Sequence, residues 1–151
     1  MKRSIWMLTL AALVFGGCAN TQLQTPAGFA VHDGNETYDY RASDGEGVVL
    51  AVRSEKNRMG GDLAYWTSTL DVELRQQGYE ARALTEVTSA DGLTGQQIRY
   101  ALPYEGRELS FWVTLFVTPR QVVIVEAGGD TEFLSAKSEV VEKAIASLQV
   151  G

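Results

Sequence analysis

The fold is decided by two consecutive apolar segments, residues 107–118 (RELSFWVTLFVT) and 121–127 (QVVIVEA), which only a Pro-Arg pair separates. In the first segment alternate positions are apolar, and the intervening positions still include Trp112 and Phe116. Large apolar residues on both faces predict a strand whose sheet is covered on both sides. The nearly continuous apolar run of the second segment indicates the same environment. We therefore expect a central sheet packed between two layers.

More strands are expected on the N-terminal side of these two segments. β-Branched and aromatic residues alternate there with turn-forming stretches. The Asp44-Gly45 pair favours a tight hairpin turn, and the stretch at 88–92 separates a second pair of strands. The additional strands are expected at residues 36–43, 47–54, 79–87 and 93–103.

Two segments have helical periodicity instead. Within residues 62–77, apolar side chains recur at spacings of three, four and four, at Leu63, Trp66, Leu70 and Leu74. Asp62 is a suitable N-cap and Gly78 a suitable left-handed C-terminal stop for this helix. A final helix is expected over residues 131–149, where an apolar stripe recurs at helical spacing.

The resulting order of elements is ββαββββα, which predicts an α+β fold with a mostly antiparallel sheet. The two helices are expected to cover opposite faces, giving an α/β/α sandwich. A one-faced α+β roll is the alternative arrangement.

This order of elements, with a few local motifs, resembles the PsbP/Mog-type domains, which include the DcrB-like bacterial envelope proteins. The resemblance extends over residues 28–150 and rests on Gly28-Phe29, Asp44-Gly45, Trp66 and Gly78-Tyr79. It implies a binding or assembly module. The group has no catalytic residues to carry over to this chain.

The first 17 residues have the pattern of a secretory signal peptide: two positive charges, a short apolar stretch and small residues before Cys18. Val14 to Cys18 also resembles the lipobox of bacterial lipoproteins, although Phe15 stands where Leu is most common. The resemblance implies lipidation of Cys18. Since Ala19 and not Asp follows, it implies an outer-membrane lipoprotein on the periplasmic face.

The chain of 151 residues divides into three parts on this interpretation. Residues 1–17 form the signal peptide, 18–28 the lipidated Cys18 and a flexible tether, and 29–151 a single globular domain. The formal charge of −6 becomes −8 when Lys2 and Arg3 are removed. Because anionic headgroups attract basic segments, we expect this acidic domain to contact the membrane only through the lipid.

Composition excludes several classes of function. One Cys and one His exclude an intrachain disulfide and a Cys/His zinc site, and the chain lacks the strongly basic segment that nucleic-acid binding requires. The single imidazole, His32, stands among turn-forming residues without a recognisable nucleophile motif. We expect no catalytic residues and no cofactor.

Three candidate sites remain. Residues Arg53, Asn57, Arg58, Gly60 and Gly61 form a locally basic, glycine-rich loop and are the candidate partner or anion contact. A loose divalent-metal site is the second candidate, at Asp33, Asn35, Glu36 and Asp39. The third is an open face at Trp112 and Phe116 rimmed by Tyr100 and Tyr104, although we expect Trp112 and Phe116 to lie in the core.

The sequence therefore predicts a non-enzymatic, membrane-anchored envelope lipoprotein that binds an envelope protein or assists assembly. The alternative is a lipoprotein that binds a small ligand or a divalent metal, at the acidic segment or in a pocket under the glycine-rich loop.

Overall fold

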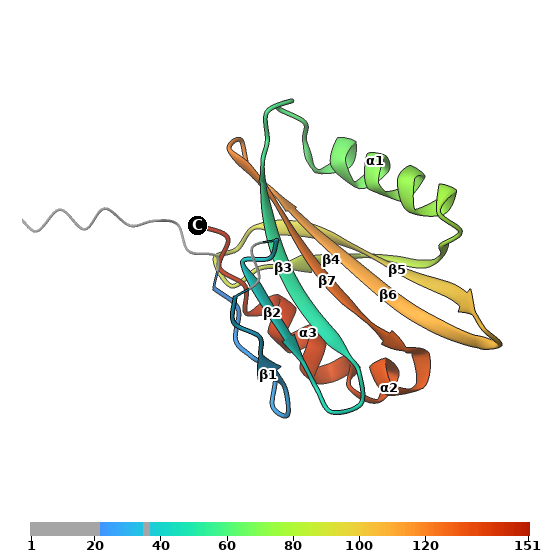
Figure 1. Ribbon diagram of the computed structural model, residues 1–151. Coiled ribbons are helices and arrows are strands. Elements are labelled where there is room, and N and C mark those ends of the chain that lie inside the picture. Colours follow the sequence, from blue (N-terminus) through green and yellow to red (C-terminus); the bar gives the residue numbers. More distant parts are fainter. Residues whose placement is uncertain (1–21, 35–36) are drawn as a thin grey trace, which may run out of the picture.

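An antiparallel sheet organises the chain in the computed structural model, which describes residues 22–34 and 37–151 (Figure 1). In these residues the strand order is β1-β2-β3-β7-β6-β5-β4. The strands are β1 (Ala30–Val31), β2 (Tyr40–Ser43), β3 (Val49–Lys56), β4 (Glu80–Thr88), β5 (Thr94–Tyr104), β6 (Arg107–Val117) and β7 (Gln121–Asp130). The six strands from β2 onward lie within or close to the predicted segments, and β1 was not predicted.

The sheet joins two local units. The β2–β3 hairpin and the β4–β7 meander each form from neighbouring segments, and β3 then pairs with β7, with Val52 opposite Val125. This pairing places β4 at one edge of the sheet and β1 at the other.

Helix α1 (Leu63–Gln76) connects β3 to the distant edge strand β4 and has the predicted ends. The Asp62 carboxylate accepts a hydrogen bond of 2.8 Å from the Tyr65 N–H at the N-terminus. At the C-terminus Gly78 has φ +95°, and the Tyr79 N–H donates to the Leu74 carbonyl at 3.1 Å. With the bond from the Gly78 N–H to the Arg75 carbonyl, this is a Schellman motif.

The prediction of one continuous helix over residues 131–149 is wrong. The segment forms α2 (Thr131–Ala136) and α3 (Ser138–Ala146), and the backbone of Lys137 between them leaves helical geometry at φ −108° and ψ 9°. The Lys137 ammonium pairs with Asp44 at 2.9 Å and with Glu46, both in the β2–β3 turn. A tertiary ion pair that the local sequence pattern does not encode thus holds the chain at the bend.

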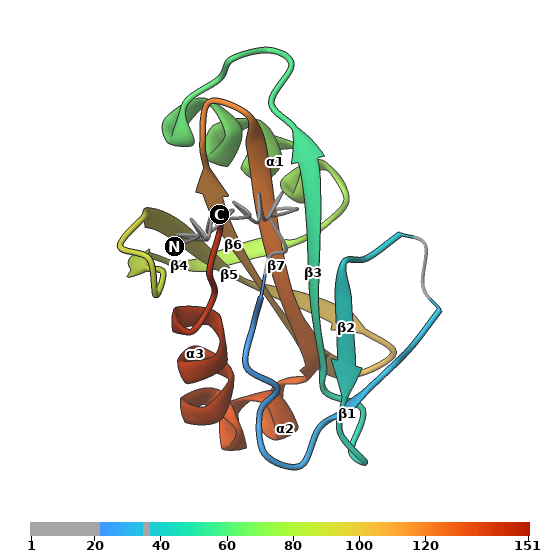
Figure 2. The same cartoon turned by 90° about the vertical axis from the view of Figure 1, so that its left-hand side faces the viewer.

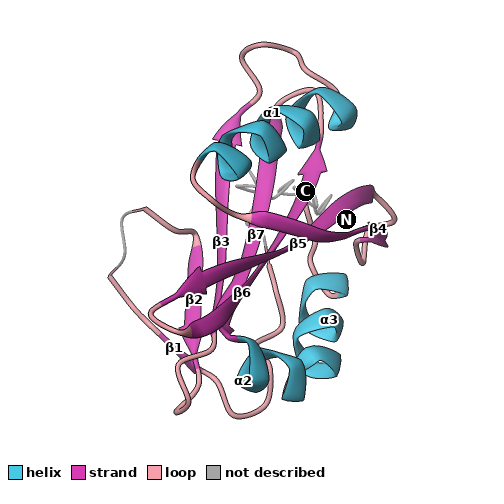
Figure 3. Cartoon of the chain, turned by 90° about the vertical axis from the view of Figure 1, so that its right-hand side faces the viewer, coloured by secondary structure: helices cyan, strands magenta, loops and turns pink. Residues whose placement is uncertain are grey.

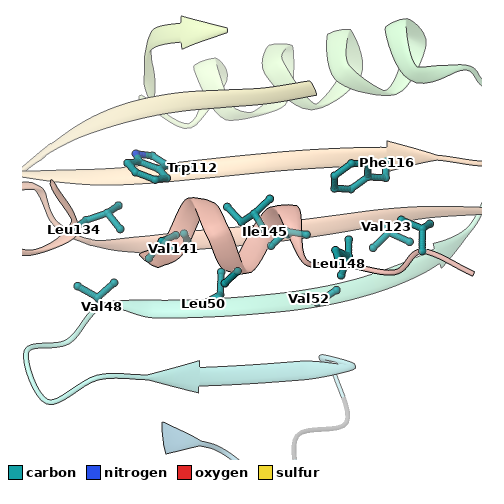
Figure 4. Close-up of a cluster of buried hydrophobic side chains, with 14 residues drawn as sticks. Val48, Leu50, Val52, Trp112, Phe116, Val123, Leu134, Val141, Ile145 and Leu148 are labelled. Carbon is teal, nitrogen blue, oxygen red and sulfur yellow. The ribbon is translucent and has the colours of Figure 1, made fainter. Parts of the chain in front are cut away.

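The helices cover opposite faces of the sheet, which confirms the α+β sandwich (Figure 3). One cluster of buried residues lies between the sheet and α2 and α3, and it contains Trp112 and Phe116 (Figure 4). These two side chains are therefore core. A second cluster lies under α1 and contains Tyr100, which is only 2% exposed. The expectation that Tyr100 rims an open surface is wrong, whereas Tyr104 is exposed.

The described part of the predicted tether lies against the domain. Gln22 pairs with Gln149 through reciprocal backbone hydrogen bonds of 3.3 and 2.9 Å, and the Gln24 N–H donates to Ser147 Oγ at 2.9 Å. Leu23 packs on the α3-side core and Pro26 is buried. Residues 22–28 therefore lie against the domain, because Leu23 packs on the core and Pro26 is buried. Cys18 and the rest of residues 1–21 lie outside the described residues.

None of the helices in residues 22–34 and 37–151 combines the length and the apolar character needed to cross a bilayer.

Candidate functional site

The glycine-rich loop between β3 and α1 is organised by one buried side chain, Asn57, which is 8% exposed. Its amide nitrogen donates to the carbonyls of Gly61 (2.9 Å) and Thr118 (3.0 Å). Its amide oxygen accepts from the Gly61 N–H (3.1 Å) and from the Trp66 indole N–H (3.0 Å). The Asn57 amide therefore joins the loop, α1 and the residue that follows β6 through bonds within the chain.

The two glycines of this loop meet separate backbone requirements. Gly60 has φ +63°, a conformation that other residues rarely adopt. At Gly61 a Cβ atom would lie 2.3 Å from the Tyr65 ring and 2.8 Å from Trp66 Nε1. Both positions serve the close approach of the loop to the first turn of α1.

Arg53 lies apart from the loop, in the middle of β3. Its guanidinium forms an ion pair with Glu126 on β7 at 3.3 Å and another with Glu55. Of the five predicted contact residues, the structure thus leaves Arg58 as the exposed cation of the loop, next to the 73% exposed side chain of Met59. Contact of these residues with a partner stays a prediction.

A small cavity of about 110 Å³ lies beside Arg53 and Trp66, between β3 and α1. It corresponds to the pocket expected under the loop. Pockets for small organic ligands have volumes of about 300–1,000 Å³, so this cavity is too small for such a ligand.

A larger groove of about 480 Å³ lies between α1 and the edge strand β4. Small side chains give it room, and both α1 and β4 contribute them: Ala64, Ser68, Ala81 and Ala83. On the outer side of β4 no described strand is paired, and Leu84 is 61% exposed. The groove therefore runs beside a free backbone edge nine residues long.

Polar groups of α1 also belong to this groove. Thr67 lines it, is 7% exposed, and its hydroxyl oxygen is buried without a hydrogen-bond partner in the described part of the chain. Asp71 lines it too and accepts a hydrogen bond of 2.8 Å from the Tyr100 hydroxyl. Burial of Tyr100, and then its bond to the Asp71 carboxylate, raise the pKa of this phenol well above its usual value. Tyr100 is therefore a neutral donor that holds Asp71 in place.

Strand β4 carries a bulge where its register with β5 shifts between Ala81 and Ala83. The bulged residue Arg82 pairs with Glu80 at 2.9 Å and with Glu108 at 3.4 Å. Bulges and charges at an edge strand restrict indiscriminate pairing with other chains. The open stretch therefore lies on the C-terminal side of the bulge.

Sequence reasoning missed this groove. The exposed Leu84 within a run of small and polar residues was the available signal, but a sequence alone does not state which strand lies at the edge. That position follows from the pairing of β3 with β7.

The other candidate residues are dispersed. His32 is exposed, and its Nε2 atom lies 2.6 Å from Ser43 Oγ, while no carboxylate in the described ranges bonds to its ring. In the acidic segment, Asn35 and Glu36 lie outside the described residues, and Asp33 and Asp39 are exposed. Among the described residues no group of three or more potential metal-binding His, Cys, Asp or Glu side chains occurs. A metal site at residues 33–39 stays a prediction.

Comparison with known proteins finds similarity at the level of the fold. No protein-family model matches the chain, and no curated protein matches it. Among solved structures, the chain is similar to LpqN of Mycobacterium tuberculosis, described as involved in cell envelope biogenesis. The TM-score is 0.71 at 11% identity, over 89% of this chain and 86% of that one.

Two further solved structures share the architecture. The cyanobacterial PsbP protein (CyanoP) of Synechocystis has a TM-score of 0.58 at 13% identity, over 94% of this chain and 99% of that one. A Pseudomonas aeruginosa protein of unknown function, described as a putative regulator, has a TM-score of 0.57 at 13% identity, over 83% and 84%. The chain therefore has a PsbP-like α+β fold.

Proposed function

We propose that this chain is a non-enzymatic lipoprotein of the bacterial cell envelope whose domain binds an extended segment of an envelope protein. Lipid on Cys18 anchors it to the outer membrane, on the periplasmic face. The groove between α1 and β4 receives the partner.

The observation that carries this proposal is the free edge of β4 beside a groove. An extended peptide can add to an exposed sheet edge through main-chain hydrogen bonds, while neighbouring pockets select its side chains. The residues from Ala83 to Thr88 offer such an edge beyond the bulge at Arg82. The small side chains of Ala64 and Ser68 leave room for side chains of the added strand.

The buried, unpaired hydroxyl of Thr67 supports the proposal that a polar group of the bound segment enters the groove. An unpaired buried hydroxyl destabilises a protein by about 1–3 kcal/mol. A backbone or side-chain group of a bound segment that reached it would remove that cost. The involvement of LpqN in cell envelope biogenesis is compatible with an envelope location for this chain too.

Site-specific photocrosslinking from position 83, whose side chain also lines the groove, tests the proposal in intact cells. We expect an adduct with an envelope protein, and we expect Leu84→Asp to reduce its capture at least about tenfold by placing a charge in the contact. Val31→Asp is the matched control, because Val31 is 50% exposed on the opposite edge strand β1. Equal capture by both variants would contradict the proposal.

The anchor is tested separately with Cys18→Ser. We expect wild-type chain in the membrane fraction, with the mass of a lipidated protein from Cys18 onward, and loss of that lipid mass in the variant. A wild-type chain without lipid would refute the anchor and leave the groove proposal standing.

A further inference from the structure

The structure points to a second contact, with the membrane itself, at the end of the sheet from which the anchor leaves the domain. We propose that Lys56, Arg58, Met59 and Arg120, here called the basic tip, bind anionic phospholipid headgroups and orient the domain on the bilayer. This inference rests on the proposed lipidation of Cys18.

The docked N-terminal segment shortens the distance between lipid and domain. Gln22 is held on Gln149, and it is only four residue steps along the chain from Cys18. A fully extended chain spans about 3.5 Å per residue, which limits this connection to about 14 Å. A flexible tether as far as Gly28 would have allowed about 35 Å. The end of the domain near Gln22 therefore stays close to the headgroups.

Hydrogen bonds connect this end to the basic tip. The Gln121 side chain donates to the Val150 carbonyl at 2.7 Å, next to Gln149. The Asn57 N–H donates to the Arg120 carbonyl at 2.9 Å, and Lys56 lies opposite Gln121 in the sheet. The β3–α1 loop and the β6–β7 turn lie together at one end of the sheet (Figure 1, Figure 2).

The cations of the basic tip differ in their ion pairing from most other cations of the described chain. Lys56, Arg58 and Arg120 are exposed and form no ion pair there. Elsewhere in the described ranges, the cations other than the half-buried Arg41 are paired with carboxylates.

The nearby carboxylates of Asp62 and Asp91 accept hydrogen bonds from backbone N–H groups. The tip is thus locally basic in an acidic protein, and the proposed contact differs from the expectation that the membrane is contacted only through the lipid.

The composition of the tip fits a headgroup surface. Lys and Arg near an anionic membrane each increase binding about fivefold, within roughly the Debye length of about 8–10 Å. Met59, 73% exposed between the cations, adds an apolar side chain that can enter the interface. Because the anchor brings lipid to this end, anionic lipid is favoured over an acidic protein as its ligand.

A single label tests the contact. Since lipidation consumes Cys18, Met59→Cys supplies a unique thiol for a fluorophore on the lipidated full chain. The chain is reconstituted in phosphatidylcholine vesicles, with or without 30% phosphatidylglycerol, that carry a headgroup nitroxide quencher. We expect quenching at position 59 to increase about twofold or more with phosphatidylglycerol and to fall back in 1 M salt, where the Debye length is about 3 Å.

Two controls make the result specific. A label at Ser135→Cys, in α2 at the far end of the domain, should show no such increase. The triple variant K56Q/R58Q/R120Q should abolish the increase at position 59. The charge-matched variant R75Q/R107Q/K143Q should retain it, because those cations lie elsewhere and are paired.

Equal quenching at position 59 in neutral and anionic vesicles, or an increase that survives in K56Q/R58Q/R120Q, would overturn the inference. Failure of the chain to reconstitute in either vesicle would instead refute the lipid anchor of the proposed function.

Discussion

The two faces of the sheet are packed against their helices by different kinds of side chain. Under α2 and α3, the larger cluster consists of fully buried apolar side chains such as Phe116, Val123 and Ile145. Under α1 the apolar cluster is smaller, and polar groups complete the packing: Asn57 joins the loop to the helix, and Thr67 keeps an unpaired hydroxyl beside a groove. The first face provides stability. The second combines weaker packing with room for a partner.

The largest loss of stability should come from truncating a buried side chain in the core between the sheet and α3. Phe116→Ala removes a fully buried ring and should lower the free energy of unfolding by about 3–5 kcal/mol. Leu70→Ala, a half-buried residue on α1, should cost only about 1–2 kcal/mol. Urea unfolding of both variants measures the difference. Equal losses would mean that the two faces contribute alike.

An intermediate effect is expected at the polar junction of the α1 side. Asn57→Ala leaves the Gly61, Thr118 and Trp66 groups without their partner and should cost about 2–3 kcal/mol in urea unfolding. Arg58→Ala, the exposed neighbour, should change stability by less than about 0.5 kcal/mol and serves as the control. A cost at Asn57 no greater than at Arg58 would show that the amide does not hold the loop.

The smallest effect should have the opposite sign. Thr67→Val keeps the shape of the side chain and removes a buried hydroxyl that has no partner in the described chain, so it should stabilise the domain by about 1 kcal/mol. The same change should weaken capture from position 83 if the hydroxyl serves the groove. Thr114→Val is the comparison, because the Thr114 hydroxyl accepts a hydrogen bond from Gln97 and its removal should destabilise. A Thr67→Val variant that is less stable than the wild-type domain would indicate that the hydroxyl forms a stabilising interaction in the free domain.

Much of the fold could be predicted because it depends on local patterns. The alternation around Trp112 and Phe116 indicated a sheet covered on both faces, and both side chains are core. Asp62 and Gly78 marked the ends of α1 correctly, since caps and left-handed stops are read from neighbouring residues. The bend at Lys137 and the docking of Gln22 could not be predicted, because each depends on residues far along the chain.

The candidate site was predicted less well for the same reason. The β3–α1 loop was recognised by its glycines and charges, but the sequence does not show that Asn57 points inward or that Arg53 pairs with Glu126. Nor does it show that Arg120 lies beside that loop, or that β4 has a free edge.

The sequence by itself determined α1 and the six strands from β2 onward, the alternation of apolar residues in the central strand β6, and the resemblance of residues 14–18 to a lipobox. These are properties of spacing over a few residues. Only the tertiary structure decided which strands lie at the edges, where the groove opens, and which cations gather at the end of the sheet near Gln121. Those features depend on pairings such as Val52 with Val125 and Gln22 with Gln149, whose partners lie too far apart in the chain for any local pattern to specify.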